Sequence, residues 1–163
     1  MLPSLKKQTI PRMELLAALI LARLTTRIKT ALEQCLVIRR VRCWTDSKNV
    51  LYWIQGKDKE WKHFVNHRVV EIRQLLPTDL WAHVPGVENP ADLASRGVNS
   101  LSLASNSLWW NGSTWLSSEE EAREMEDVSG IIQPPPECLK EMKVQAVRDL
   151  EESDSHTPCD KHT

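Results

Sequence analysis

The sequence predicts an α/β fold with at least some parallel pairing of strands. Apolar residues recur at helical spacing over residues 11–34, 48–55 and 61–76, which favours three amphipathic helices. Residues 36–45 and 80–84 are short and rich in Val, Ile, Leu and Trp, a composition that favours strands. Helices and strands therefore alternate along the chain, and this order is typical of layered α/β domains.

The first predicted helix carries a long apolar pattern. Pro11 suits its first turn, where a missing N–H costs nothing. Ala17, Ala18 and Ala22 would let this helix approach a sheet closely. The spacing predicts an apolar stripe made of Met13, Leu16, Ile20, Leu24, Ile28 and Ala31.

Each of the two predicted strands is followed by a turn or a helix. In the first strand, one side is formed by Val37, Arg39, Val41 and Cys43. Asp46 follows its carboxyl end, and the helix that comes next stops near Gly56. Pro77 ends the following helix, Pro85-Gly86 marks a turn after the second strand, and another helix begins near Asn89. Two strands cannot form a stable sheet, so we expect a sheet that lacks its first strands.

Composition divides the chain into three parts. Residues 1–99 form the predicted α/β domain, and residues 100–117 form an extension with three tryptophans that we expect to pack on it. Residues 118–163 are acidic and rich in Ser, Asp, Glu and Lys, which predicts a largely disordered tail with one helix near residues 137–150.

The net charge of −1 hides a strong asymmetry. Residues 1–73 contain 15 Lys or Arg against 6 Asp or Glu, whereas residues 118–163 contain 5 against 13. A basic half suits a polyanionic partner, although surface cations on helices are also common without any ligand. The basic cluster nearest the predicted site contains Arg39, Arg40, Arg42, Lys48, Lys57, Lys59 and Lys62.

Targeting and redox features favour an intracellular protein that is not in the membrane. The longest apolar run, residues 15–22, is too short to cross a bilayer, and no secretory signal precedes it. The four cysteines are scattered without a paired motif, so reduced thiols are expected rather than a disulfide framework. The compartment, cytoplasm or nucleus, is left open.

Three carboxylates fall at positions that suit metal-dependent phosphodiester chemistry. Glu14 begins the first helix, Asp46 ends a strand and Asp92 begins a later helix. Such a site needs hard oxygen ligands from separate elements, and these elements converge where the strands of an α/β sheet end. Each residue also has a structural interpretation: Glu14 as an acid at a helix N-terminus, Asp46 as part of a helix cap, and Asp92 as a surface residue in a first turn.

Several multi-residue motifs occur together and in order. They are Thr9-Ile10-Pro11-Arg12-Met13-Glu14-Leu15, Cys43-Trp44-Thr45-Asp46-Ser47, His83-Val84-Pro85, Asn89-Pro90-Ala91-Asp92-Leu93-Ala94-Ser95-Arg96-Gly97 and Leu108-Trp109-Trp110-Asn111-Gly112. In this combination the chain resembles the ribonuclease H domain of BEL/Pao-type retrotransposon polyproteins over roughly residues 5–117. The resemblance implies a ribonuclease H-like mixed sheet with flanking helices and magnesium-dependent cleavage of the RNA strand of an RNA–DNA hybrid.

The resemblance also implies four catalytic carboxylates, of which the last three match Glu14, Asp46 and Asp92. The first is absent from this chain, because no acidic residue precedes Glu14. We therefore expect a truncated ribonuclease H-like fragment with weak or absent Mg²⁺ binding and little or no nuclease activity. Two alternatives stay open: an upstream reverse transcriptase segment of a larger Pol polyprotein completes an active enzyme, or the chain is a domesticated, non-enzymatic remnant that binds a protein partner.

Other residues have competing interpretations. Arg42, Ser47, Lys48 and Lys62 are the candidate contacts to an RNA–DNA hybrid, through salt-dependent binding of phosphates. Four tryptophans could stack on bases, but core packing is the commoner role, and we assign it to Trp44 and Trp53. His63 and His67 stand four residues apart and could bind zinc. They lack a matching third ligand, which favours solvent-exposed histidines.

Overall fold

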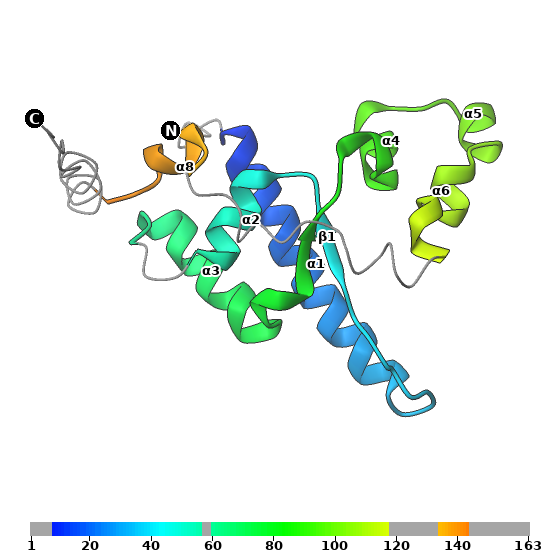
Figure 1. Ribbon diagram of the computed structural model, residues 1–163, viewed down its shortest axis with the longest axis horizontal. Helices are drawn as coiled ribbons and strands as arrows, with labels where there is room; N and C mark the ends of the chain where they lie inside the picture. Colours follow the sequence, from blue (N-terminus) through cyan, green and yellow to red (C-terminus); the bar gives the residue numbers. More distant parts are fainter. Residues whose placement is uncertain (1–7, 57–59, 118–133, 144–163) are drawn as a thin grey trace, which may run out of the picture.

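The computed structural model describes residues 8–56, 60–117 and 134–143. Its element order is α1, β1, α2, α3, β2, α4, α5, α6 and α8, with short 3-10 helices between them. Figure 1 shows α1 running diagonally beside α2 and α3, while α4, α5 and α6 lie on the other side of the two strands. This helix-rich arrangement around a small parallel sheet confirms the predicted α/β class.

Helix α1 spans Ile10–Leu32 and packs on α3 and α2. Its buried residues are Leu15, Ala18, Leu19 and Ala22. The predicted apolar stripe lies largely outside the core, because Met13, Ile20, Leu24 and Ile28 are between 48% and 63% exposed. Both sets satisfy helical spacing, and the helix is apolar on opposite faces. Only one of these faces is used by the described part of the chain.

The sheet consists of β1, Cys43–Thr45, and β2, Trp81–His83. The strands are parallel and pair Cys43 with Trp81, Trp44 with Ala82 and Thr45 with His83. The first strand is much shorter than the predicted 36–45. Residues 37–42 have no strand assignment, because strand structure requires a hydrogen-bonded partner, and the only described partner is three residues long.

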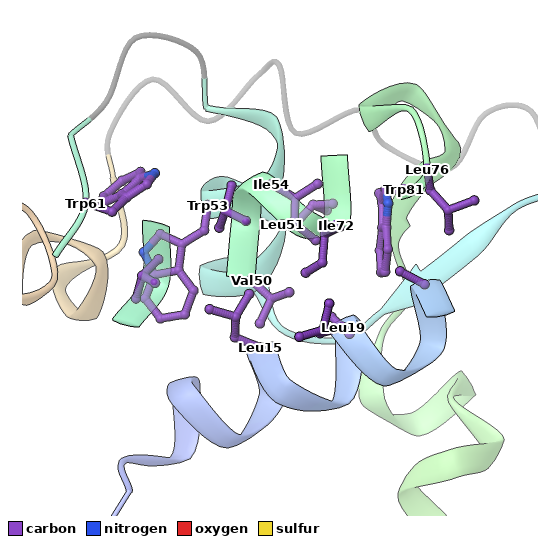
Figure 2. Packing of buried hydrophobic residues seen from close by; sticks show 14 of the residues in the cluster. Leu15, Leu19, Val50, Leu51, Trp53, Ile54, Trp61, Ile72, Leu76 and Trp81 are labelled. Carbon is purple, nitrogen blue, oxygen red and sulfur yellow. The ribbon is translucent and has the colours of Figure 1, made fainter. Parts of the chain in front are cut away.

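Helices α2, Lys48–Gln55, and α3, His63–Leu75, pack on each other and on α1, and α2 also contacts both strands. The bounds of α2 follow from local signals. The Ser47 hydroxyl accepts a hydrogen bond from the Val50 amide, and Gly56 ends the helix. Figure 2 shows Leu15 and Leu19 of α1 facing α2, α3 and Trp81. Large aliphatic side chains buried in this way each contribute about 1.5–3 kcal/mol.

Three tryptophans complete the core. Trp53, Trp61 and Trp81 are at most 2% exposed, and the rings of Trp53 and Trp61 meet edge to face with centroids 6.5 Å apart. The prediction of a core role is thus confirmed for Trp53. Trp44 is instead half-buried at the sheet and outside this core cluster.

The chain after β2 forms a run of short helices. They are η2 at Gly86–Glu88, α4 at Pro90–Arg96, α5 at Ser100–Ala104, α6 at Ser107–Asn111 and η3 at Thr114–Ser117. A further 3-10 helix, η1 at Thr78–Leu80, comes directly before β2. Asparagine side chains cap three of them: Asn89 accepts from the Ala91 amide, Asn99 from Ser102 and Asn106 from Trp109. Side-chain caps therefore contribute more to the positions of these short helices than apolar burial does.

Residues 134–143 pack against the domain, where the sequence predicted a largely disordered tail with one helix near residues 137–150. Helix α8, Pro136–Lys140, contacts α2, and Cys138 is fully buried beside Asn49. Met142 is 2% exposed and forms an antiparallel bridge with Trp61. The ordering has an apolar cause, since Cys138 and Met142 fill the core beside Trp61. The remainder of the predicted tail lies outside the described residues.

Two further observations concern the described residues. None of their helices combines the length and apolar character that a bilayer crossing requires. Cys35, Cys43 and Cys138 are free thiols. Burial raises the pKa of the Cys43 thiol and raises that of Cys138 to about 12.

Candidate functional site

Asp46 and Asp92 face the same point on the backbone. A Cβ atom placed on Gly86 would lie 3.7 Å from Asp46 Oδ2 and 3.9 Å from Asp92 Oδ2. The two carboxylates, 46 residues apart in sequence, thus converge above a residue that has no side chain. Both distances are ordinary van der Waals contacts, so a Cβ atom at this position would touch both carboxylates.

The parallel sheet accounts for this convergence. Thr45 pairs with His83, so β1 and β2 end at the same edge, and Asp46 directly follows β1. After β2, the Val84 amide donates to the Thr45 carbonyl at 3.0 Å, and η2 turns the chain back toward Asp46. Asn89 then caps α4, which places Asp92 in the first turn of the helix. Carboxyl ends of neighbouring parallel strands are the usual position of ligand sites in α/β folds.

Glu14 reaches the same edge through Ser47. The Ser47 hydroxyl donates to Glu14 Oε2 at 2.5 Å, and Ser47 follows Asp46 directly in the chain. This bond ties the first turns of α1 to the start of α2. Glu14 is therefore linked to the residue beside Asp46 rather than to the Asp46 carboxylate.

Arg96 occupies the other side of Asp92. Its Nε lies 2.8 Å from Asp92 Oδ2 in an i,i+4 ion pair on α4. The hydrogen bond that Arg96 donates to Asp92 is the main cause of a raised pKa of the Arg96 guanidinium, and the charge of Asp46 acts in the same direction. Arg96 was not among the predicted site residues, although its four-residue spacing from Asp92 on a helix was a usable signal.

The carboxylate oxygens at this edge are chemically suited to a hard divalent cation, but their arrangement does not form a complete metal site. Carboxylate oxygens are the ligands that Mg²⁺ prefers, and those of Asp46 and Asp92 share one point. Within residues 8–56, 60–117 and 134–143, however, no three Asp, Glu, His or Cys side chains are grouped closely enough to hold a metal ion. Glu14 is directed to Ser47, and Arg96 neutralises Asp92. These two contacts would have to change for all three carboxylates to act together.

A tryptophan from the extension connects the elements that carry the two aspartates. Trp115 Nε1 donates to Glu88 Oε2 at 2.5 Å, and Ser113 Oγ donates to the Glu88 carbonyl at 2.7 Å. The Trp115 ring also packs edge to face on Trp44, with centroids 4.8 Å apart. Trp44 precedes Asp46, and Glu88 belongs to the turn before Asp92. Sequence reasoning missed this role of Trp115 and Glu88, since no local pattern links them.

The predicted nucleic-acid contacts differ in their accessibility. Lys48 is exposed at the start of α2, next to Asp46. Arg42 is exposed but donates to the Asp79 carbonyl at 2.7 Å, and the Lys62 ammonium donates to the Lys140 carbonyl. Ser47 is only 6% exposed, and its hydroxyl is used by Glu14 and by the cap of α2. Lys57 and Lys59 lie outside the described residues.

The two helix histidines lie away from the carboxylates. The rings of His63 and His67 stack with centroids 6.1 Å apart on the outer face of α3. They line an open depression of about 450 Å³ together with Asn66, Val70, Glu71 and Gln74. Glu71, the nearest acidic residue on this face, is paired with Arg23 at 2.6 Å. The two histidines therefore have no third metal ligand among the described residues.

Comparison with known proteins gives a family match at the beginning of the chain. Residues 1–47 match a family model described as the Pao retrotransposon-like RNaseH-like domain. The predicted resemblance to a Pao-type ribonuclease H domain is thus confirmed over this region. The match includes Glu14 and Asp46, covers less than a third of the chain and does not reach Asp92. No curated protein and no solved structure matches the chain.

Proposed function

We propose that this chain is a ribonuclease H-like fragment that binds RNA–DNA hybrids and uses Glu14, Asp46 and Asp92 as the remnant of its metal site. The convergence of Asp46 and Asp92 on Gly86 supports this proposal most directly. The match of residues 1–47 to the Pao ribonuclease H-like family adds independent support, because it contains Glu14 and Asp46. Neither line of support depends on the overall shape of the fold.

The carboxylates would hold the cation at the edge of the sheet. Asp46 and Asp92 supply oxygens around one point, and Glu14 stands one residue away through Ser47. A bound magnesium ion would supply an activated water and stabilise the leaving oxygen in phosphodiester hydrolysis. The chain itself supplies the negative charge that attracts the cation.

Catalysis by the 163-residue chain alone is proposed to be weak or absent. Glu14 is its first acidic residue, so this sequence contains three of the four carboxylates that the family resemblance implies. Arg96 further reduces the negative charge of the site by pairing with Asp92. Fewer negative ligands bind a hard cation more weakly, and hydrolysis falls accordingly.

Hybrid binding does not require the missing carboxylate. Lys48 begins the helix that follows Asp46, whereas Arg42 precedes β1 and so lies at the opposite end of that strand from Asp46. Residues 1–73 carry a net charge of +9, from 15 basic and 6 acidic residues. Lysine and arginine contacts to phosphates give affinity that falls steeply with salt and depends little on sequence.

The test measures binding and cleavage of a labelled RNA–DNA hybrid by the 163-residue chain. We expect binding at low salt that weakens in Lys48→Gln and Arg42→Gln variants, and no cleavage with Mg²⁺. Cleavage that disappears in Asp46→Asn but persists in Asp79→Asn, a control at an exposed acid outside the site, would refute the proposed inactivity. Absence of binding at low salt would refute the nucleic-acid function.

A further inference from the structure

The first turn of α1, which precedes Glu14, has little local stabilisation. Thr9 occupies the N-cap position, but among the described residues its side chain makes no capping hydrogen bond. The first turn also contains no acidic residue, although an acid there would be favoured by the helix dipole. Ile10, the first residue of the helix, is 73% exposed. The position of Glu14 therefore depends on contacts with distant residues.

Arg12 makes such a contact, two residues before Glu14. Its guanidinium donates two hydrogen bonds to the Glu141 carboxylate, from Nε at 2.7 Å and from Nη2 at 2.9 Å. The same guanidinium lies over the Phe64 ring of α3, 4.7 Å from the ring centroid. Paired forks of this kind fix geometry as well as adding energy. Residues 134–143, which contain Glu141, are thus tied to the start of α1.

The 134–143 segment also contacts the start of α2, the helix that Ser47 caps. The Cys138 thiol donates toward Asn49, with Sγ 3.4 Å from Oδ1 and 3.6 Å from the backbone carbonyl oxygen. Cys138 is fully buried at this contact. Figure 1 shows α8 next to the beginnings of α1 and α2. One short segment therefore contacts the first turns of both helices.

Backbone hydrogen bonds anchor this segment independently of α1 and α2. The Lys62 amide donates to the Glu141 carbonyl at 2.7 Å, and the Lys143 amide donates to the Glu60 carbonyl at 2.9 Å. Met142, between these two bonds, is 2% exposed. The backbone of Glu141 is thus held from both sides, so that its side chain reaches Arg12 from a fixed point.

We propose that the 134–143 segment positions the candidate metal site by holding Glu14 and Ser47 together. The Ser47 hydroxyl donates to Glu14 Oε2 at 2.5 Å. Arg12 lies two residues before one partner of this bond, and Asn49 lies two residues after the other. Outer contacts that orient metal ligands are part of how a metal site binds its cation. This inference rests on the proposed function, because it concerns the same carboxylates.

Glu141 is a positioning residue in this arrangement, since it acts through Arg12. A role in stability alone gives a different expectation. Met142 is buried in the same segment, and shortening its side chain would lower stability while keeping the contacts to Arg12 and Asn49. The affinity for a cation should therefore respond to Glu141 and not to Met142.

The test measures Mn²⁺ affinity by electron paramagnetic resonance and amide exchange at Met13 and Glu14, in full chains that circular dichroism shows to be folded. Arg12→Gln and Glu141→Gln change the net charge in opposite directions, so charge alone would shift the affinity in opposite directions. We expect both variants to weaken Mn²⁺ binding roughly fivefold or more and to speed exchange of these amides about fivefold. Met142→Ala should lower the urea midpoint and change neither quantity.

Three results would overturn the proposed positioning role. They are opposite shifts of Mn²⁺ affinity in the two glutamine variants, unchanged amide exchange in both, and an equal loss of affinity in Met142→Ala. Mn²⁺ binding that is absent from the parent chain, or insensitive to Asp46→Asn, would instead contradict the proposed function, and amide exchange would then decide whether the segment holds α1. If Glu141→Gln unfolds, Glu141→Asp replaces it, because the shorter side chain keeps the charge and loses the two-point contact.

Discussion

Trp115 donates its indole N–H to Glu88 and places its ring against Trp44. These two contacts connect the turn before Asp92 to the strand before Asp46. They give a half-buried tryptophan near the end of the extension a role at the candidate site, although it touches neither carboxylate.

Replacing Trp115 by Phe should loosen this connection. The ring contact with Trp44 is kept, but the hydrogen bond to the Glu88 carboxylate is lost, at a cost of about 1 kcal/mol in unfolding free energy. Urea unfolding measures the stability, and hydrogen exchange should show faster amides at residues 86–89. Trp110→Phe is the matched control, because the Trp110 indole is 66% exposed and bonds only within the extension. Equal effects of both changes would contradict the proposed connection.

Replacing Arg96 by Gln should strengthen cation binding at the site. The change frees Asp92 from its ion pair and removes a positive charge that also acts on Asp46. We expect the affinity for Mn²⁺, measured by electron paramagnetic resonance, to rise roughly threefold to tenfold. Arg27→Gln removes an equal charge from exposed α1 surface and should have little effect. Unchanged Mn²⁺ affinity in Arg96→Gln would show that Asp92 does not contribute to cation binding.

Glu141 should stabilise the fold through Arg12. Its carboxylate accepts hydrogen bonds from Arg12 Nε at 2.7 Å and Nη2 at 2.9 Å, and the Glu141 side chain is 11% exposed. We expect Glu141→Ala to cost about 2 kcal/mol, and a double-mutant cycle with Arg12→Met to show coupling. Glu137→Ala breaks an exposed i,i+3 pair with Lys140 and should cost less than about 0.5 kcal/mol. Additive effects of the two changes at Arg12 and Glu141 would contradict the pairing.

Cys138 should make the fold sensitive to alkaline pH. Burial raises the pKa of its thiol to about 12 from an ordinary value of 9.0, so the folded state favours the neutral thiol. This contribution is complete below pH 9 and is lost as pH rises toward 12, because the unfolded chain releases its proton first. Unfolding free energies between pH 8 and 11 should decline less steeply in Cys138→Ala than in the parent chain. Cys35→Ser, at an exposed thiol, should leave that slope unchanged.

Local signals predicted the elements whose ends are fixed by nearby residues. Helix α2 occupies residues 48–55 as expected, because Ser47 and Gly56 act within one turn of it. The burial of α1 was not predictable in the same way, since two apolar patterns coexist on the helix and only tertiary packing selects Leu15 over Met13. The strand at 36–45 was overextended because its pairing depends on a partner that sequence alternation cannot supply.

The candidate site was likewise predictable in part, where it depends on local sequence, and unpredictable where it depends on tertiary packing. Strand order explains why Asp46 and Asp92 lie at one edge, since both follow parallel strands. The bonds that restrain this edge were not predicted: Ser47 to Glu14 and Trp115 to Glu88 join residues 33 and 27 positions apart. Such contacts depend on three-dimensional packing and leave no periodic trace in the sequence. A helix near residues 137–150 was predicted, but its docking was not, because the burial of Cys138 and Met142 depends on contacts with distant residues.

The ion pair between Arg12 and Glu141 also bears on how the protein is made. Its partners are separated by 129 residues, which a ribosome adding about 5–20 residues per second needs roughly 6–26 seconds to produce. During that interval Trp61 cannot acquire its contact with Met142. The nascent chain must therefore spend several seconds with this side of its core uncovered, a period in which chaperones have access to surface that the finished protein hides.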